Sequence, residues 1–254
     1  MEQTYIVVFD SGVGGVSVLR HLRRMLPGEN FLYYGDDANA PYGRCSTERV
    51  RQLTLQAVDR LLTDFSVKAL VVACNTATSA AISLLREKYP DLIVIGIEPA
   101  LKPAADRFPG GHIGIMATQV TLREKKLSDL MVRYGENCTI SRIPAPGLVE
   151  LVEAGQGNTP QTEALLRPIL EPYRGQLDAL VLGCTHYPFA EAAIAKILGE
   201  KTLLLDGAEG TARQTRRRLA EAGLLTACVQ TGTVRIEHSG ENPHFATLVR
   251  TLME

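Results

Sequence analysis

Two cysteines occupy matching places in two similar stretches of the sequence, and thiols in such places can carry protons. Cys74 lies in ALVVACNTATSAA and Cys184 in ALVLGCTHYPFAEAA, each after an apolar strand-like run and before an alanine-rich helical run. A helix N-terminus favours a thiolate, so we expect a depressed pKa for these thiols. A single cysteine of this kind is more often inert, but the repetition favours a function in proton transfer.

A pair of opposed thiols suits the inversion of a carbon centre. One proton must leave one face of Cα and another must arrive at the opposite face, and a single base cannot easily serve both. A cysteine pKa near ~8.5 allows one thiol to be charged while the other is neutral at pH 7. Because an amino-acid α-proton is far less acidic than a thiol, geometry, desolvation and positive dipoles must stabilise the carbanion-like state.

Two loops carry further polar residues that could hold a ligand. The run Asp10–Gly15 (DSGVGG) follows an apolar segment, and its glycines permit close backbone approach to a carboxylate or phosphate. It is neither a dinucleotide fingerprint nor a P-loop, because no GxGxxG and no following Lys-Ser/Thr is present. The run Gly35–Gly43 (GDDANAPYG) has turn residues at Pro41 and Gly43, and a surface turn and a ligand-binding loop are equally open here.

Apolar β-branched segments alternate with amphipathic segments, which predicts an α/β fold with mostly parallel sheets covered on both faces. The two cysteines lie 110 residues apart, and Asp10 and Thr118, both after strand-like runs, lie 108 apart. We therefore expect two similar α/β domains related by a pseudo-twofold axis, with the active site between them. The first domain is predicted to span 1–98 plus 208–254, and the second 99–207. The predicted strands are 5–9, 31–34, 69–73, 92–97, 112–116, 138–143, 179–182 and 202–205. The predicted helices are 16–25, 47–62, 77–87, 121–133, 160–170, 190–198 and 210–222, followed by short polar strands that return to the first domain.

The composition is that of a soluble globular protein. Of 254 residues, 45% are hydrophobic and 22% charged, and the net charge of −1 favours neither nucleic acid nor an anionic membrane as a partner. No segment approaches the ~20 apolar residues of a membrane span, and the N-terminus lacks a signal-peptide pattern, so we expect a cytoplasmic protein. Five widely spaced cysteines without a CxxC pair predict free thiols and no metal site.

Several motifs together resemble those of the glutamate racemases. They are FDSGVGGVSVLR, YYGDDANAPYG, VVACNTA, GIMATQVT, LVELVEAG and LVLGCTHYP, in the family's order and spacing over nearly the whole chain. The resemblance implies two α/β domains and the interconversion of L- and D-glutamate with no cofactor, neither pyridoxal phosphate nor metal. It also implies that D-glutamate feeds peptidoglycan synthesis, that the chain forms a homodimer, and that a cell-wall precursor regulates it.

The resemblance further implies roles for single residues. Cys74, helped by Asp10, matches the thiol that serves the D-enantiomer. Cys184, assisted by His186, matches the thiol that serves the L-enantiomer. The positions that match the family's substrate-binding pattern are Asp10, Ser11, Pro41, Tyr42, Gly43, Asn75, Thr76, Thr118, Thr121, Thr185 and His186.

Acidic residues near the family's site are matched with two departures. Asp36 and Glu153 match acidic positions, and Glu153 is assigned to the catalytic group. The stretch before LVE is Ala-Pro-Gly at 145–147, where the family usually has Cys-Pro, so Glu150 is an alternative to Glu153. We choose Glu153 because the LVE-small-Gly context fits it. Asp37 stands where the family more often has threonine.

Other functions remain open from the sequence. A racemase for another acidic amino acid, notably aspartate, would use the same two thiols. A redox protein would join Cys74 and Cys184 in a disulfide, which requires Cα atoms within about 7 Å. A binding protein could keep the fold without catalysis, although a binder needs no thiols. Cys45, Cys138 and Cys228 match no motif and are expected to take no part.

Overall fold

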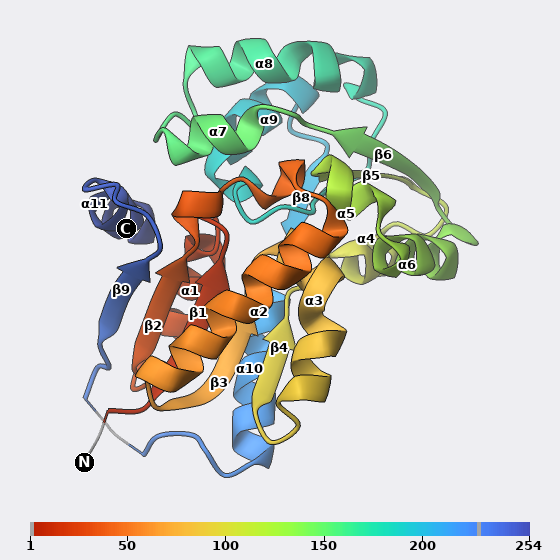
Figure 1. The fold of residues 1–254 in the computed structure, drawn as a ribbon. Helices are drawn as coiled ribbons and strands as arrows, with labels where there is room; N and C mark the ends of the chain where they lie inside the picture. The colour runs from red at the N-terminus through yellow and green to blue at the C-terminus, as the bar shows by residue number, and fades with distance from the viewer. Residues whose placement is uncertain (1–2, 228–229) are drawn as a thin grey trace.

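The computed structural model describes residues 3–227 and 230–254, so Cys228 lies outside the described residues. It contains two parallel sheets, of strand order β4-β3-β1-β2-β9 and β6-β5-β7-β8 (Figure 1). Helices cover both faces of each sheet, which confirms the predicted α/β class. The strands are β1 (Tyr5–Asp10), β2 (Phe31–Gly35), β3 (Val67–Val72), β4 (Ile93–Gly96), β5 (His112–Ala117), β6 (Thr139–Pro144), β7 (Ala179–Leu182), β8 (Leu203–Asp206) and β9 (Val234–His238).

The first sheet is buried on both faces because the side chains of its apolar strands alternate between two layers of helices. Ile6 and Val8 of β1 pack with α1, α10 and α11, whereas Val7 and Phe9 pack with α2 and α3. Continuous apolar strands of this kind are typical of parallel sheets. The helices are α1 (Val16–Met25), α2 (Thr47–Asp64), α3 (Asn75–Lys88), α10 (Ala208–Glu221) and α11 (Phe245–Met253).

The second sheet is covered in the same way. Met116 and Leu180 pack with α7, α8 and α9, and Ile115 and Val181 pack with α4, α5 and α6. The helices are α4 (Leu101–Arg107), α5 (Gln119–Arg123), α6 (Lys125–Gly135), α7 (Leu148–Glu153), α8 (Pro160–Leu170) and α9 (Glu191–Leu198). Short 3-10 turns occur at η1 (Asp37–Asn39), η2 (Tyr42–Arg44), η3 (Glu171–Tyr173) and η4 (Tyr187–Ala190).

The prediction of one continuous helix over 121–133 is wrong. Two helices, α5 and α6, meet at Glu124, whose backbone is extended at φ −68° and ψ 138°. The Glu124 carboxylate accepts a hydrogen bond from the Thr47 hydroxyl at 2.5 Å, a contact with the first domain. A tertiary contact of this kind leaves no trace in the local apolar pattern.

The tail after α10 also differs from the prediction of polar strands alone. One strand, β9, does return to the first domain and pairs in parallel with β2, from Phe31 opposite Val234 to Gly35 opposite His238. The chain then forms helix α11, which the sequence analysis missed. The division of the chain at residues 98 and 208 stays a prediction.

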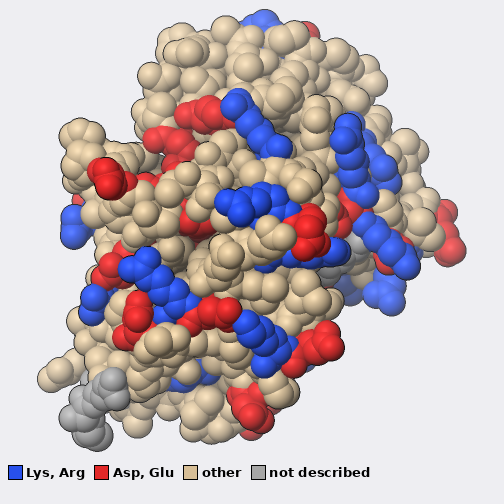
Figure 2. All heavy atoms as spheres, viewed as in Figure 1, with Lys and Arg blue, Asp and Glu red and all other residues tan. Residues whose placement is uncertain are grey.

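The surface carries mixed charge. Basic and acidic side chains are intermingled over the face drawn in Figure 2. Arg217 and Arg218, within the densest basic run of the sequence, are exposed and pair with Glu221. Within residues 3–227 and 230–254, no helix has the length and apolar character needed to cross a bilayer.

Candidate active site

The candidate site gathers residues at the carboxyl ends of central strands, where ligands bind in open α/β sheets. Asp10 ends β1 and Cys74 follows β3 in the first domain, while Thr118 follows β5 and Cys184 follows β7 in the second. All four side chains are buried. Because hydrogen bonds join the two groups directly, they form one site between the domains.

Cys74 is the N-cap of α3. Its Sγ accepts a hydrogen bond from the backbone N–H of Ala77 at 3.4 Å and lies 3.6 Å from Ser11 Oγ. Burial raises the pKa of the Cys74 thiol to about 12, and the charge of Asp10 adds to the rise. The prediction of a depressed pKa for Cys74 is therefore wrong. The effect of burial on this pKa is larger than the lowering by the helix N-terminus and the two hydrogen bonds. A charge on Cys184 raises the same pKa further, so the two sulfurs interact electrostatically.

Asp10 links the domains. The Thr185 hydroxyl donates to its Oδ2 at 2.9 Å, and the backbone N–H of Gly12 donates to its Oδ1 at 3.0 Å. Burial raises the pKa of Asp10 from 3.8 to about 6, although the positive charge of His186 and the two hydrogen bonds oppose the rise. A carboxyl group with this pKa is mostly ionised at neutral pH and takes up a proton under mildly acidic conditions.

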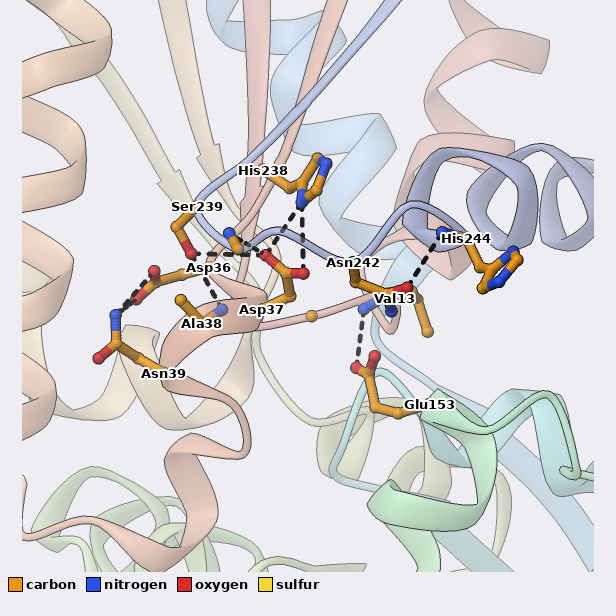
Figure 3. Close-up of polar contacts among 12 residues, drawn as sticks. Val13, Asp36, Asp37, Ala38, Asn39, Glu153, His238, Ser239, Asn242 and His244 are labelled. Carbon is orange, nitrogen blue, oxygen red and sulfur yellow. Dashed lines mark hydrogen bonds and ion pairs between the residues drawn. The ribbon is translucent and has the colours of Figure 1, made fainter.

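Cys184 is held beside an ion pair. His186 Nδ1 lies 3.8 Å from Cys184 Sγ, and His186 Nε2 lies 2.5 Å from Glu153 Oε1. The backbone N–H of Val13 donates to the same Glu153 oxygen at 2.8 Å (Figure 3). Burial alone would lower the pKa of His186, but its contacts with Cys184 and Glu153 raise that pKa well above its usual value. Burial would raise the pKa of Glu153, yet the bond and charge of His186 lower it, so the pair is an imidazolium and a carboxylate.

Two glycines of the DSGVGG loop, Gly12 and Gly14, are required by close approach to the second domain. A Cβ on Gly14 would collide with the His186 ring, and one on Gly12 would overlap the Glu153 carboxylate. The Tyr33 hydroxyl, from β2, donates to the Gly12 carbonyl at 2.6 Å and so fixes the backbone of the loop. The sequence analysis missed Tyr33, because an aromatic residue in an apolar strand gives no polar signal.

Three threonines and one asparagine form a buried polar cluster next to Cys74 in the structure. Thr76 Oγ1 lies 3.2 Å from the hydroxyls of both Thr118 and Thr121, which lie 3.0 Å from each other. Asn75 is buried, and its Oδ1 has no hydrogen-bond partner. An unsatisfied buried acceptor costs about 1–3 kcal/mol, so this oxygen has an unused capacity to accept a hydrogen bond.

The Gly35–Gly43 run, which the sequence left open between surface turn and binding loop, is tied into this region. Buried Asp36 accepts hydrogen bonds from the Tyr42 hydroxyl at 2.5 Å and from Asn39 Nδ2 at 3.0 Å. Gly43 packs so tightly on Thr118 that an added Cβ would lie 2.9 Å from the threonine Cβ. The run therefore meets the second domain beside the threonine cluster.

A cavity of about 390 Å³ lies alongside this contact, with walls from both domains. Arg44 of η2 forms an ion pair with Glu150 of α7 across it, whereas Glu153, one turn further along α7, contacts His186. The two glutamates that the sequence left as alternatives thus have different partners. Residues on the cavity wall include Pro41, Gly43, Arg44, Cys45, Thr118, Arg123, Glu150 and Tyr187.

Of the remaining described cysteines, Cys45 lies on the wall of this cavity, whereas Cys138 bonds to a residue outside the candidate site. Cys45, Cys74, Cys138 and Cys184 are all free thiols. Cys138 donates to a backbone carbonyl, that of Phe108, at 3.4 Å. In the part of the chain that the structure describes, no group of three or more His, Cys, Asp or Glu side chains is arranged to hold a metal ion.

The chain belongs to a family of racemases. Residues 6–215 match the family described as Asp/Glu/Hydantoin racemase, and the chain belongs to that family of isomerases. It is 44% identical over 255 residues to the glutamate racemase of Clostridium perfringens, an alignment that covers all of this chain and 98% of the relative. Its similarity to glutamate racemases, expected from the sequence motifs, is thereby confirmed.

Solved structures agree. The glutamate racemase of Thermus thermophilus, in complex with β-chloro-D-alanine, superposes with a TM-score of 0.80 at 38% identity, covering 100% of this chain and 94% of that one. The Escherichia coli glutamate racemase, in complex with L-glutamate and the activator UDP-MurNAc-Ala, gives 0.83 at 31% identity, covering 99% and 94%.

Proposed function

We propose that this racemase interconverts L- and D-glutamate by a two-base mechanism in which Cys74 and Cys184 are the acid and base, without a cofactor. One observation carries the proposal. Two buried free thiols lie at corresponding strand ends of the two domains, and they are close enough for the charge of one to affect the other. The names of the relatives supply glutamate as the substrate.

The polar groups of the site match an α-amino acid. The orphan Oδ1 of Asn75 and the carboxylate of Asp10 are acceptors for the substrate ammonium group. An ammonium group beside Asp10 offsets the negative charge that raises the pKa of Cys74, so substrate binding itself eases formation of the Cys74 thiolate. Donors for the two carboxylates of the substrate come from the proposed binding residues Ser11, Tyr42, Gly43, Thr76, Thr118, Thr121 and Thr185, with Pro41 beside them.

Proton transfer then uses one thiol on each face of Cα. In the L-to-D direction, the Cys184 thiolate takes the α-proton, and the electron pair of the C–H bond remains on the substrate, spread towards its carboxylate. The Cys74 thiol delivers its proton to the opposite face and becomes a thiolate. With a pKa of about 12 in the empty site, Cys74 is protonated at neutral pH and is ready to be the donor. The reverse reaction exchanges the two roles.

The remaining groups of the network position the thiols and share their protons. The His186 imidazolium, fixed by Glu153, donates towards Cys184 from 3.8 Å. The charge of Asp10 acts on Cys74, and the hydroxyl of Ser11, the next residue after Asp10, lies 3.6 Å from the Cys74 sulfur. Each thiol therefore has a titratable neighbour that can help it gain or lose a proton.

A direct assay tests the proposal. Purified protein incubated with L-glutamate, without added cofactor, is expected to reduce the optical rotation to zero. In deuterium oxide, the product is expected to carry deuterium at Cα. L-Aspartate is the matched control for the alternative substrate. Faster racemisation of aspartate would overturn the choice of glutamate, and retention of the original α-hydrogen would overturn the two-base mechanism.

We further propose a place in the cell for this activity. D-Glutamate made in the cytoplasm feeds peptidoglycan synthesis and so supports cell-wall biogenesis and cell shape. The activator bound to the Escherichia coli relative supports a cell-wall precursor as regulator, and a homodimer is proposed from the family resemblance. Sedimentation velocity with and without UDP-MurNAc-Ala, alongside the rate of racemisation, tests both: a monomer at all concentrations excludes the dimer, and an unchanged rate excludes the regulator.

A further inference from the structure

Two adjacent carboxylates of the Gly35–Gly43 run, those of Asp36 and Asp37, accept hydrogen bonds from different parts of the chain. Asp36 bonds to Tyr42 and Asn39 within its own loop. Asp37 instead bonds to the turn between β9 and α11, some two hundred residues further along the chain (Figure 3). One carboxylate thus orders the loop internally, and the other ties it to the C-terminal segment.

Asp37 receives several donors from that turn. The backbone N–H of Gly240 donates to Asp37 Oδ1 at 2.7 Å, the Ser239 hydroxyl to the same oxygen at 3.5 Å, and His238 Nδ1 lies 3.2 Å from it. In return, the backbone N–H of Ala38 donates to the Ser239 hydroxyl at 3.1 Å. These contacts leave the Asp37 side chain only 10% exposed, which is unusual for an acidic residue in a turn.

The turn is itself anchored in the first domain. The His238 ring stacks on Phe245 of α11, with centroids 4.8 Å apart, and Phe245 is buried in the core and stacks on Tyr33. Tyr33 in turn holds the Gly12 carbonyl of the DSGVGG loop. We call the contacts of Asp37 with His238, Ser239 and Gly240 the clamp. Through Phe245 and Tyr33, the clamp connects the Gly35–Gly43 run to the DSGVGG loop.

We propose that Asp37 is a positioning residue that holds the loop of Pro41, Tyr42 and Gly43 in its substrate-binding conformation through the C-terminal segment. This inference rests on the proposed function, because that function assigns the three residues to the substrate. A released loop would populate the binding conformation for only part of the time. The apparent affinity for substrate falls by that fraction, while the chemistry at the thiols is unchanged once substrate is bound.

Two substitutions break the clamp from opposite sides. Asp37→Ala removes the acceptor. Gly240→Ala adds a Cβ that would lie 2.6 Å from Asp37 Oδ2 and displace that carboxylate, without backbone strain because Gly240 does not have a positive φ. The matched control is Asn242→Ala, which removes the side-chain acceptor of the His244 N–H in the same segment and keeps the Asn242 carbonyl that accepts from the Phe245 N–H.

Three measurements are made on each protein: KM and kcat for glutamate, thermal unfolding by circular dichroism, and amide hydrogen exchange of residues 38–45. Asp37→Ala and Gly240→Ala are expected to raise KM about tenfold, corresponding to a competent fraction of about one tenth, with kcat changed less than about twofold. Exchange over 38–45 is expected to accelerate in both. Asn242→Ala is expected to change neither KM nor this exchange, even where it lowers the unfolding temperature.

The outcomes separate this inference from the proposed function. Wild-type KM in a folded Asp37→Ala or Gly240→Ala variant overturns the positioning role, as does a similar rise in KM for Asn242→Ala. If the wild-type protein does not racemise glutamate, the proposed function fails. The exchange measurement still decides about the clamp in that case, and unchanged exchange over 38–45 overturns it.

Discussion

Replacing Asp10 with asparagine is expected to stabilise the protein at neutral and alkaline pH while impairing catalysis. Asp10 is fully buried, and its pKa rises from 3.8 in an ordinary aspartate to about 6 in the fold. Asparagine has nearly the same shape. Its side-chain oxygen can accept the Gly12 N–H, and its amide can donate to the Thr185 hydroxyl, so both contacts of the carboxylate are retained.

The sign and size of the effect follow from proton linkage. Because the folded protein holds the Asp10 proton more tightly than the unfolded chain, the contribution of Asp10 to stability is complete below pH 3.8. It is lost as pH rises towards 6 and then stays constant. A pKa difference of about 2, at about 1.4 kcal/mol per pKa unit, makes the loss about 3 kcal/mol. Asp10→Asn has no charge to bury and escapes this loss.

Urea denaturation followed by circular dichroism at pH 4 and pH 8 measures the difference. The free energy of unfolding of Asp10→Asn is expected to exceed that of the wild type by up to about 3 kcal/mol at pH 8, and by little at pH 4. Asp106→Asn is the control, because Asp106 is 60% exposed and forms a surface ion pair with Lys102. A variant that is less stable than wild type at pH 8, or a difference that is the same at both pH values, would refute the reasoning.

Further predictions concern the thiols and their neighbours. Cys74→Ala and Cys184→Ala are each expected to lower kcat by at least about 100-fold with unfolding temperatures near wild type; near-normal turnover in either variant contradicts the two-base mechanism. His186→Asn is expected to lower kcat for L-glutamate more than for D-glutamate. Because enantiomers have equal free energies, kcat/KM must remain equal in the two directions, and equal losses of kcat would argue against a specific link to Cys184. Gly14→Ala is expected to lower activity at least tenfold by displacing His186, whereas Gly210→Ala, at an open position of α10, should leave activity unchanged.

The sequence was sufficient to locate the two thiols but not to predict the ionisation of Cys74. The repeat that contains Cys74 and Cys184 is local in sequence, and each cysteine does follow a buried strand. The helix terminus also exists, since Ala77 N–H donates to Cys74 Sγ. What the sequence could not supply is the depth of burial and the nearby charge of Asp10, because both arise only when distant segments pack together.

The elements that were missed share a physical cause. At the break between α5 and α6, Glu124 accepts a hydrogen bond from Thr47, which is distant in sequence. Helix α11 is short, and only Phe245 and Val249 of it are deeply buried, so its periodic signal is brief. Likewise, the sequence GDDANAPYG does not predict that Asp36 bonds within the loop and Asp37 to the C-terminal segment, because these contacts depend on where β9 pairs.

Two of the hydrogen bonds that join the two domains are made by residues of the candidate site. Thr185 reaches across to Asp10, and Glu153 reaches back to the Val13 N–H. A movement that parts the domains to admit substrate must break these bonds and remove the imidazolium from the neighbourhood of Asp10. The charges that set the pKa values of Asp10 and His186 would then lie together only in the closed molecule. Because burial is the first cause of the raised pKa of Cys74, opening would lower that pKa and make this thiol more reactive towards alkylating agents from the bulk solvent.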